Sequence, residues 1–518
     1  MEAPTWTPVR TPTPAERRTI VRHFHKFYNN VIVAGIYDFP LNRKSAEFTQ
    51  VETYVDALSE CLRDHPFLAV VLKKTAKTDD IYAQATQVDF RQHFHAIEPP
   101  DNIAKEISAQ VSENALLRFV IEHLCNDERL AFFNTADTIP GWRLDVLPLG
   151  TKGERQRVFI SFTYAHYIAD GMSGVAFHRS LLTGLDRSLR VGMRSPGTVF
   201  QTPQRARELA GLPHLPISPM YLLAPALGLY LPSFLSKALG LKPSVSGSDP
   251  GTWSGTMKFV AAPGSVPPVT TAVEILSIDG RTIAAVLGVC RKHNTKLTSL
   301  LNELIAQCLS RHLPAHSSGF ADKTNFISAT SINLRKAAGI SDHEMGVFAS
   351  ASYTRHEIEH LDAEQDNIKT DDAFWSAVSN ASREMARDAS RLRDQPSGLL
   401  NWVANFDSWM EGQLGKSRDA SWQLSNLMSF DGDLRGGGDA ISVERMFFCQ
   451  PADAIGEPLD FNVISTKDGD LVICAGWQVG AIGLEEKAGK GVEAIEREFV
   501  RNVLRDLERH FTVLAEET

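Results

Sequence analysis

Hydrophobic and polar positions alternate along this chain with two different periods. Apolar residues recur at helical spacing between positions 51 and 62, and the run HPFLAVVLKK that follows is typical of a buried strand. From 158 to 166 every second residue lies on one predominantly apolar face, which predicts a strand, and Ser173 offers an N-cap for a helix through GVAFHRSLL. His166 is therefore expected at the C-terminal end of a strand, where open sheets bind their ligands.

The second half of the chain mixes strands and helices in the same way. TAVEILSI, TNFISATSINLR, MGVFASASYT and DLVICAGWQV predict strands, and apolar stripes predict helices around 283–290, 301–309, 374–392 and 492–511. Many prolines and glycines in 201–260 predict a crossing connection. With 518 residues the chain is too long for one ordinary core. We therefore expect an α/β protein, an α+β two-layer sandwich, with lobes at 1–200 and 261–518 joined by the connector 201–260.

One stretch of the connector, residues 215–236, carries no charged side chain over 22 residues. It is long enough to span a bilayer as a helix, but four prolines would interrupt that helix repeatedly. A membrane span, a membrane-surface patch or apolar lid, and an ordered connector that covers the core are all open interpretations.

The net charge and the cysteine pattern limit the binding partners and the cellular compartment that we expect for this protein. Acidic residues outnumber basic ones by 62 to 53, and no basic run could follow a phosphate backbone, so nucleic acid is not an expected partner. Six cysteines form no CxxC pair, and the N-terminal residues lack the apolar core of a secretion signal. We expect reduced thiols and a cytoplasmic monomer, with peripheral membrane contact through 215–236 as an alternative.

Two histidine patterns carry candidate chemistry. In the first, His166 is followed by Asp170 and directly by Gly171, with a predicted strand before and a predicted helix after. This HxxxDG context is less frequent by chance than the similar spacing at His123 and Asp127, which lacks the glycine.

The second pattern, HEIEH at 356–360, satisfies HExxH, which places two zinc-binding imidazoles on one helix face beside a glutamate base. A zinc hydrolase that uses His356, Glu357 and His360, with Glu384 as a further ligand, is therefore an alternative. The residues that follow are highly charged and lack the glycine and third histidine of longer zinc motifs. This context favours a solvated acidic loop, and no metal is expected.

Eight sequence blocks follow one another over most of the chain: FYNNVIVAGIYDF, HPFLAVV, GWRLDV, HYIADGMSGVAFH, WSG at 253, CRKHNTKLTSLL, SINLR and LSNLMSF. In this order they resemble the coenzyme-A-dependent acyltransferases, and specifically the fungal alcohol O-acetyltransferases, which are related to the plant BAHD enzymes and to peptide-synthetase condensation domains.

The resemblance implies two chloramphenicol-acetyltransferase-like lobes with a tunnel between them, entered by the thioester from one side and by the acceptor from the other. His166 matches the family's general base. Asp170 matches its structural aspartate, which turns away from the substrate and pairs with an arginine, and SINLR nominates Arg335 for that partner. Ser425 and Asn426 in LSNL are candidate donors to the oxyanion.

The chain carries the glycine of the family motif and departs from the family pattern at three places. Gly171 is expected to supply the backbone freedom of the turn. Ala165 stands where condensation domains carry a second histidine, which disfavours a carrier-linked peptide substrate. The plant DFGWG signature is absent, and Met428 stands where relatives often have glycine. These residues therefore do not define the acceptor side of the tunnel.

The chemistry implied is acyl transfer from a thioester. A neutral imidazole can accept the proton of an alcohol as it attacks the thioester carbonyl, so direct transfer without an acyl-enzyme is expected. Acetyl-CoA or another short acyl-CoA is the expected co-substrate, with no permanently bound cofactor, and the hydroxyl of an apolar small molecule is the expected acceptor. A hydrophobic amine is the close alternative acceptor, and a non-catalytic acyl-binding relative is a further alternative.

Overall fold

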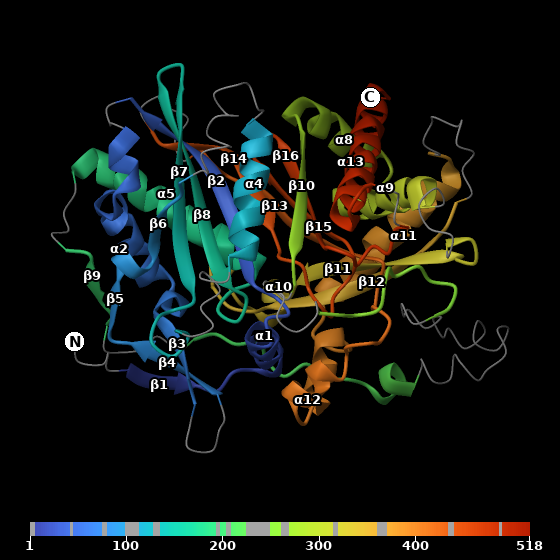
Figure 1. The fold of residues 1–518 in the computed structure, drawn as a ribbon, viewed down its shortest axis with the longest axis horizontal. Helices are drawn as coiled ribbons and strands as arrows, with labels where there is room; N and C mark the ends of the chain where they lie inside the picture. The colour runs from blue at the N-terminus through green and yellow to red at the C-terminus, as the bar shows by residue number, and fades with distance from the viewer. Residues whose placement is uncertain are drawn as a thin grey trace.

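The computed structural model describes residues 6–41, 45–74, 80–98, 113–127, 135–192, 197–203, 209–223, 249–260, 269–313, 320–359, 370–433, 440–485 and 489–517. Two large β-sheets lie side by side in the described chain and form the framework of two lobes (Figure 1). A three-stranded sheet of β1 (Trp6–Arg10), β4 (Asp80–Ala85) and β3 (Val70–Lys74) and a pair of β5 (Gln87–Asp89) with β9 (Val199–Gln201) adjoin the N-terminal lobe.

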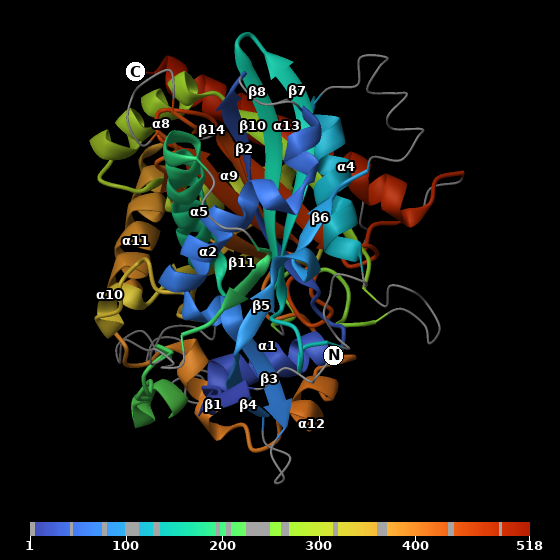
Figure 2. The ribbon, with the colours of Figure 1, turned by 90° about the vertical axis from the view of Figure 1, so that its left-hand side faces the viewer.

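The N-terminal sheet has five strands in the order β14 (Ser442–Cys449), β2 (Asn30–Pro40), β8 (Arg155–Ala165), β7 (Trp142–Lys152) and β6 (Phe94–Ala96). Helices α2 (Val55–Asp64) and α5 (Gly171–Val191) cover one face, and α4 (Glu113–Asn126) covers the other (Figure 2). Strand β2 is apolar on both faces because Val31 and Val33 contact the α2 and α5 side, whereas Ile32 and Ala34 contact the α4 side.

The C-terminal sheet has six strands in the order β10 (Thr271–Ile278), β16 (Leu471–Gln478), β15 (Asp460–Thr466), β13 (Trp422–Phe430), β11 (Asn325–Asn333) and β12 (Ala349–Glu357). Its apolar face packs against α8 (Gly280–Lys292), α9 (Leu297–His312), α11 (Asp372–Ala389) and α13 (Val492–Glu516). The short helices α1 (Pro14–Phe24), α10 (Arg335–Ala338), α12 (Phe406–Glu411) and η8 (Pro396–Trp402) join the remaining segments.

The opposite face of the C-terminal sheet carries polar side chains on β13 and at the start of β15. Gln423 lies opposite Asp460 and Ser425 opposite Asn462 in the parallel pair of β13 with β15. Tyr353 of β12 is on the same face, since it pairs with the β11 residue that pairs with Gln423. In this part of the sheet, alternation separates an apolar, helix-covered face from a face that carries hydroxyls, amides and a carboxyl group. Strands β10 and β16 are apolar on both faces, because Val273, Val472 and Cys474 pack with α4.

Strand β14 lies within 261–518, the range expected for the C-terminal lobe, but crosses into the other sheet. It pairs antiparallel with β2 and so belongs to the N-terminal sheet. The reason is its composition: Met446 and Phe448 enter the core under α2 and α5, while Phe447 and Cys449 enter the core under α4. A strand that is apolar on both faces is stable only where both faces are covered.

The described part of the connector is ordered against the protein. Leu212 and Leu215 are buried with Leu334 and Phe348, and the main chain of Pro216 accepts a hydrogen bond from Asp394 at 2.8 Å. Of the uncharged stretch 215–236, residues 224–236 lie outside the described residues. Within the described ranges, no helix combines the length and the apolar character needed to cross a bilayer.

Candidate active site

His166 lies on the turn that joins β8 to α5. Strand β8 ends at Ala165, and the turn is closed by a 2.8 Å hydrogen bond from the Tyr164 hydroxyl to the main-chain oxygen of Asp170. The His166 side chain is partly accessible. Its Nδ1 atom is buried and has no hydrogen-bond partner among the described residues. The ring centroid is 5.6 Å from that of Tyr28.

The surroundings of His166 keep its imidazole neutral. Desolvation, together with the positive charges of Arg22 and Arg18, lowers the pKa of His166 to about 4, against the ordinary value of about 6.5. Contact with its own main chain and the charge of Asp170 act in the other direction but do not outweigh burial. The unprotonated ring is therefore the dominant form at neutral pH.

Asp170 turns away from His166 and caps α5. Its Oδ1 accepts hydrogen bonds from the Ser173 main-chain N–H at 2.9 Å and from the Ser173 hydroxyl at 2.8 Å. Its Oδ2 accepts a 3.0 Å hydrogen bond from the Phe348 N–H. The N-cap of this helix is therefore Asp170, and Ser173, expected in that role, occupies the third helical position of the capping box.

Arg335 forms a bidentate ion pair with Asp170. Its two terminal nitrogens donate to the two carboxylate oxygens at 2.8 and 2.9 Å, as the resemblance implied. The guanidinium is completely buried and also donates to the main-chain oxygen of Glu344. Burial opposes ionisation of Asp170, but the charge of Arg335 and the hydrogen bonds outweigh it and hold the pKa of Asp170 below its ordinary range. The pair fastens the end of β11 in the C-terminal lobe to the start of α5 in the N-terminal lobe.

Gly171 has a different role from the one expected. It is absent from the glycines with positive φ, so the turn does not require its backbone freedom. A Cβ atom at this position would lie 2.6 Å from Leu427 and 3.2 Å from Phe448. Gly171 is therefore needed because β13 and β14 approach the first turn of α5 closely.

Ser425 and Asn426 lie on β13, two and one residues before that contact. The Asn426 amide is engaged, since its oxygen accepts from the Met428 N–H at 2.8 Å and its nitrogen donates to Thr298 at 3.1 Å. Ser425 lies on the polar face of the C-terminal sheet, and within the described part of the chain its hydroxyl has no hydrogen-bond partner. Met428 has a φ of 66°, a left-handed conformation that suits the glycine often found in relatives.

Sequence reasoning missed the residues that surround the His166 ring. The Arg22 guanidinium lies 3.8 Å from the centre of the Tyr28 ring and pairs with Asp453 at 2.6 Å. The Tyr28 hydroxyl donates to the Gln450 side chain at 2.9 Å. Tyr28 lies in the block FYNNVIVAGIYDF and could have been identified from the family resemblance, whereas Arg22 and Asp453 have no local sequence signal.

The zinc alternative is wrong in its premise, because His356 and Glu357 end strand β12 and not a helix. His356 is buried, its Nδ1 is 2.5 Å from Glu303 and its Nε2 is 2.9 Å from the Ser328 hydroxyl, so both nitrogens have protein partners. The solvated loop that we expected is also wrong for His356 and Glu357, because both lie in β12. His360 lies outside the described residues, and within them no group of three or more potential ligands could hold a metal ion.

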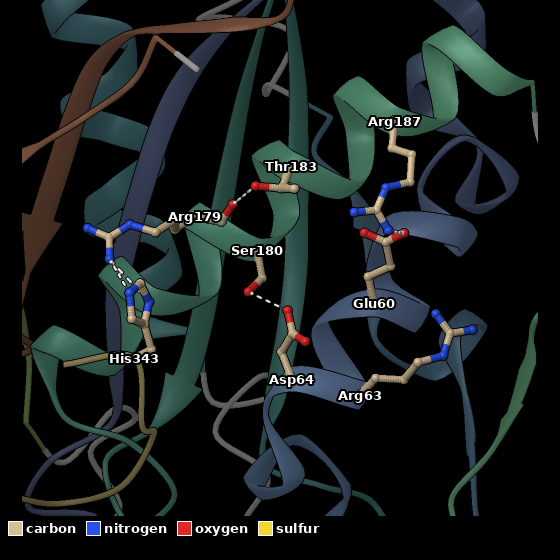
Figure 3. A pocket seen from close by; sticks show the side chains of 8 residues that line it. All are labelled: Glu60, Arg63, Asp64, Arg179, Ser180, Thr183, Arg187 and His343. Carbon is tan, nitrogen blue, oxygen red and sulfur yellow. Dashed lines mark hydrogen bonds and ion pairs between the residues drawn. The ribbon is translucent and has the colours of Figure 1, made fainter. Parts of the chain in front are cut away.

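A surface cavity of about 370 Å³ lies between α2, α5 and the loop that carries His343 (Figure 3). Within its wall, Arg187 pairs with Glu60 at 2.6 Å, and Ser180 donates to Asp64 at 3.0 Å. His166 is not among the residues that line it, so this cavity is separate from the site, and the tunnel between the lobes stays a prediction.

A family model described as alcohol acetyltransferase matches residues 16–478. The chain belongs to this family. It is accordingly an acyl-transferring enzyme, as the HxxxDG motif and the neighbouring blocks indicated.

Two curated relatives carry the same description. The chain is 22% identical over 494 residues to the probable alcohol acetyltransferase crmB of Aspergillus fumigatus, which covers 91% of this chain and 95% of that protein. It is 25% identical over 360 residues to the probable alcohol acetyltransferase FCK4 of Fusarium pseudograminearum, covering 66% of this chain and 68% of that protein.

Solved structures confirm the fold. The TRI3 trichothecene 15-O-acetyltransferase of Fusarium sporotrichioides aligns with a TM-score of 0.63 at 14% identity, over 98% of this chain and 94% of the other. The starter condensation domain of rhizomide synthetase, solved with C8-CoA and Leu-SNAC, aligns with a TM-score of 0.55 at 11% identity, over 98% of this chain and 95% of the other. The expected two-lobed fold of the chloramphenicol-acetyltransferase type is thus present.

Proposed function

We propose that this alcohol acetyltransferase moves an acetyl or other short acyl group from coenzyme A to the hydroxyl of an apolar small molecule, with His166 as general base. The observation that carries the proposal is the state of the His166 ring. It is neutral, it is partly accessible while its Nδ1 atom is buried, and the aspartate of its own motif is turned away and paired with Arg335.

The proposed reaction is a direct transfer. As the acceptor oxygen attacks the thioester carbonyl, its proton moves to Nε2 of His166, and a tetrahedral oxyanion forms. When this intermediate collapses, the C–S bond breaks and the imidazolium returns the proton to the departing thiolate. Because the pKa of His166 is about 4, the imidazolium is a strong acid compared with a thiol of pKa about 8.5, so this return is favourable.

General-base help of this kind contributes about 10²- to 10⁴-fold in rate. The rest of the acceleration must come from holding both substrates in line and from stabilising the oxyanion. Ser425 is the better candidate for the oxyanion donor, since its hydroxyl is free among the described residues whereas the Asn426 amide already has two partners. Asp170, Gly171 and Arg335 would act by positioning the histidine turn.

The proposal is tested by thiol release from acetyl-CoA with purified protein and a panel of alcohols and hydrophobic amines. His166→Ala is expected to lower turnover by at least about 10²-fold, with partial rescue by added imidazole, while its thermal unfolding stays close to that of the parent. Incubation with acetyl-CoA alone should leave the protein mass unchanged. Equal turnover by His166→Ala, or a covalent acetyl adduct without acceptor, would overturn the mechanism.

A further inference from the structure

Arg22 connects the His166 site to a second group of polar side chains. It pairs with Asp453, in the loop between β14 and β15. The same loop is held from its other end by Arg418, a completely buried residue that donates to the main-chain oxygens of Asp453 at 3.3 Å and Gly456 at 2.7 Å. The loop is thus fixed beside Tyr28 and His166 by two arginines, both of which have their partners.

Four polar side chains next to this loop have no partner. Among the described residues, no other residue forms a hydrogen bond or an ion pair with the side chains of Arg18, Tyr353, Glu457 or Asp460. Arg18 lies on α1, one helical turn before Arg22, and Glu457 and Asp460 lie at the end of the loop. Tyr353 and Asp460 project from the polar face of the C-terminal sheet.

These groups lie inside the molecule. Desolvation and the charge of Arg22 lower the pKa of Arg18, and desolvation raises the pKa of Tyr353. Desolvation and the neighbouring carboxyl groups likewise raise the pKa of Glu457. Arg18, Tyr353 and Glu457 are nevertheless partly accessible. His166 likewise combines desolvation with partial accessibility.

The donors of the Arg18 guanidinium are partly accessible and make no hydrogen bond among the described residues, so they are available to a group from outside the chain. The planar fork of donors fits a carboxylate or carbonyl oxygen. The phosphates of coenzyme A fit poorly, because they carry several negative charges and the neighbouring cation Arg22 is already paired with Asp453.

Resting on the function proposed above, we propose that Arg18, Tyr353 and Glu457 form a polar acceptor subsite beside His166. The acceptor alcohol then carries a second oxygen function, a carboxylate or carbonyl, that binds the Arg18 guanidinium while its hydroxyl meets His166. The apolar skeleton expected for the acceptor spans the distance between these two groups.

The test compares alkan-1-ols of four to ten carbons with the ω-hydroxycarboxylates of the same lengths and their methyl esters, each as acceptor with acetyl-CoA. In the parent enzyme one length of hydroxycarboxylate or hydroxyester is expected to exceed its plain alkanol in kcat/KM. Arg18→Met should remove this advantage, about ten- to a hundredfold, without changing the KM for acetyl-CoA, and should affect turnover of the alkanols much less. Arg17→Met, which makes the same charge change on the same helix, should retain the advantage.

Two measurements distinguish acceptor binding at this subsite from the acyl transfer itself. In the His166→Ala protein, titration calorimetry with the preferred hydroxycarboxylate should still detect binding, and adding Arg18→Met should abolish it. Arg18→Met should also unfold at the parent temperature or above it, because it removes an unpaired cation. Equal losses for alkanols and oxygenated acceptors, a raised KM for acetyl-CoA alone, or no advantage at any length would each overturn the subsite. A parent enzyme that is insensitive to His166→Ala would overturn the proposed function instead.

Discussion

The ion pair between Arg335 and Asp170 gives the sharpest prediction, because it joins the two lobes at the histidine turn. Arg335→Met keeps much of the side-chain volume and removes the guanidinium. The variant loses two hydrogen bonds to the Asp170 carboxylate, the bonds to the Glu344 carbonyl and the contact at 3.1 Å with the Ser173 hydroxyl. It leaves a buried carboxylate without its cation.

The magnitude follows from what Asp170 keeps. Removing one partner of a buried ion pair typically costs about 3 to 5 kcal/mol of unfolding free energy. Asp170 retains its bonds from the Ser173 main chain and hydroxyl and from the Phe348 N–H, which still favour the charged form. We therefore expect a loss near the lower limit, about 3 kcal/mol. Arg335→Lys keeps the charge but not the fork and should lose less.

Urea unfolding followed by tryptophan fluorescence measures this loss, since Trp142 in the N-terminal lobe and Trp422 and Trp477 in the C-terminal lobe are fully buried. The double variant with Asp170→Asn should be less destabilised than the sum of the two single variants, because no charge is then left unpaired. Losses below about 1 kcal/mol for Arg335→Met at an unchanged m-value, or strict additivity in the double variant, would refute the reasoning.

Further predictions concern the reacting histidine and β13. Since the lowered pKa of His166 leaves it neutral above about pH 4, kcat/KM should be flat from pH 5 to 7, and an acidic limb near about 6.5 would contradict the assigned environment. Gly171→Ala should cost about 1 to 3 kcal/mol in urea unfolding, with recovery on adding Leu427→Ala, whereas an unaffected single variant would contradict the close approach. Met428→Gly should raise stability by up to about 1 kcal/mol by relieving a left-handed backbone, and a loss would contradict this. Ser425→Ala should lower kcat about 10²-fold with the KM for acetyl-CoA retained, and unchanged kcat would exclude it as the oxyanion donor.

Local patterns predicted the elements better than their assembly. Strand β8 and the helix after the motif follow directly from alternation and helical spacing, because those periods report which face of each element is buried. Strand β14 has equally clear apolar character, but nothing in its sequence tells that its neighbour is β2 and not a strand of its own half. Pairing between distant strands is decided by the packing of whole lobes.

The candidate site likewise contains some residues that a local motif predicts and others that no local pattern predicts. His166 and Asp170 are close in sequence and were found from their motif, and the pairing with Arg335, 165 positions away, came only from the family resemblance. His356 was misread because its charged flanks suggest a loop, whereas its partner Glu303 lies 53 positions earlier on a helix. Arg22 and Asp453, 431 positions apart, illustrate the limit: a buried pair has no signature in either local segment.

The crossing of β14 into the N-terminal sheet has a consequence for how this protein comes into being. A fragment that stops at the connector exposes the unpaired edge of β2, a template for aggregation, while the complementary fragment exposes the apolar side chains of β14. Neither fragment alone contains all five strands of the N-terminal sheet. During synthesis, the N-terminal sheet lacks β14 until nearly the whole chain has left the ribosome. We therefore expect that a chaperone which shields the open edge of β2 is needed for high yield.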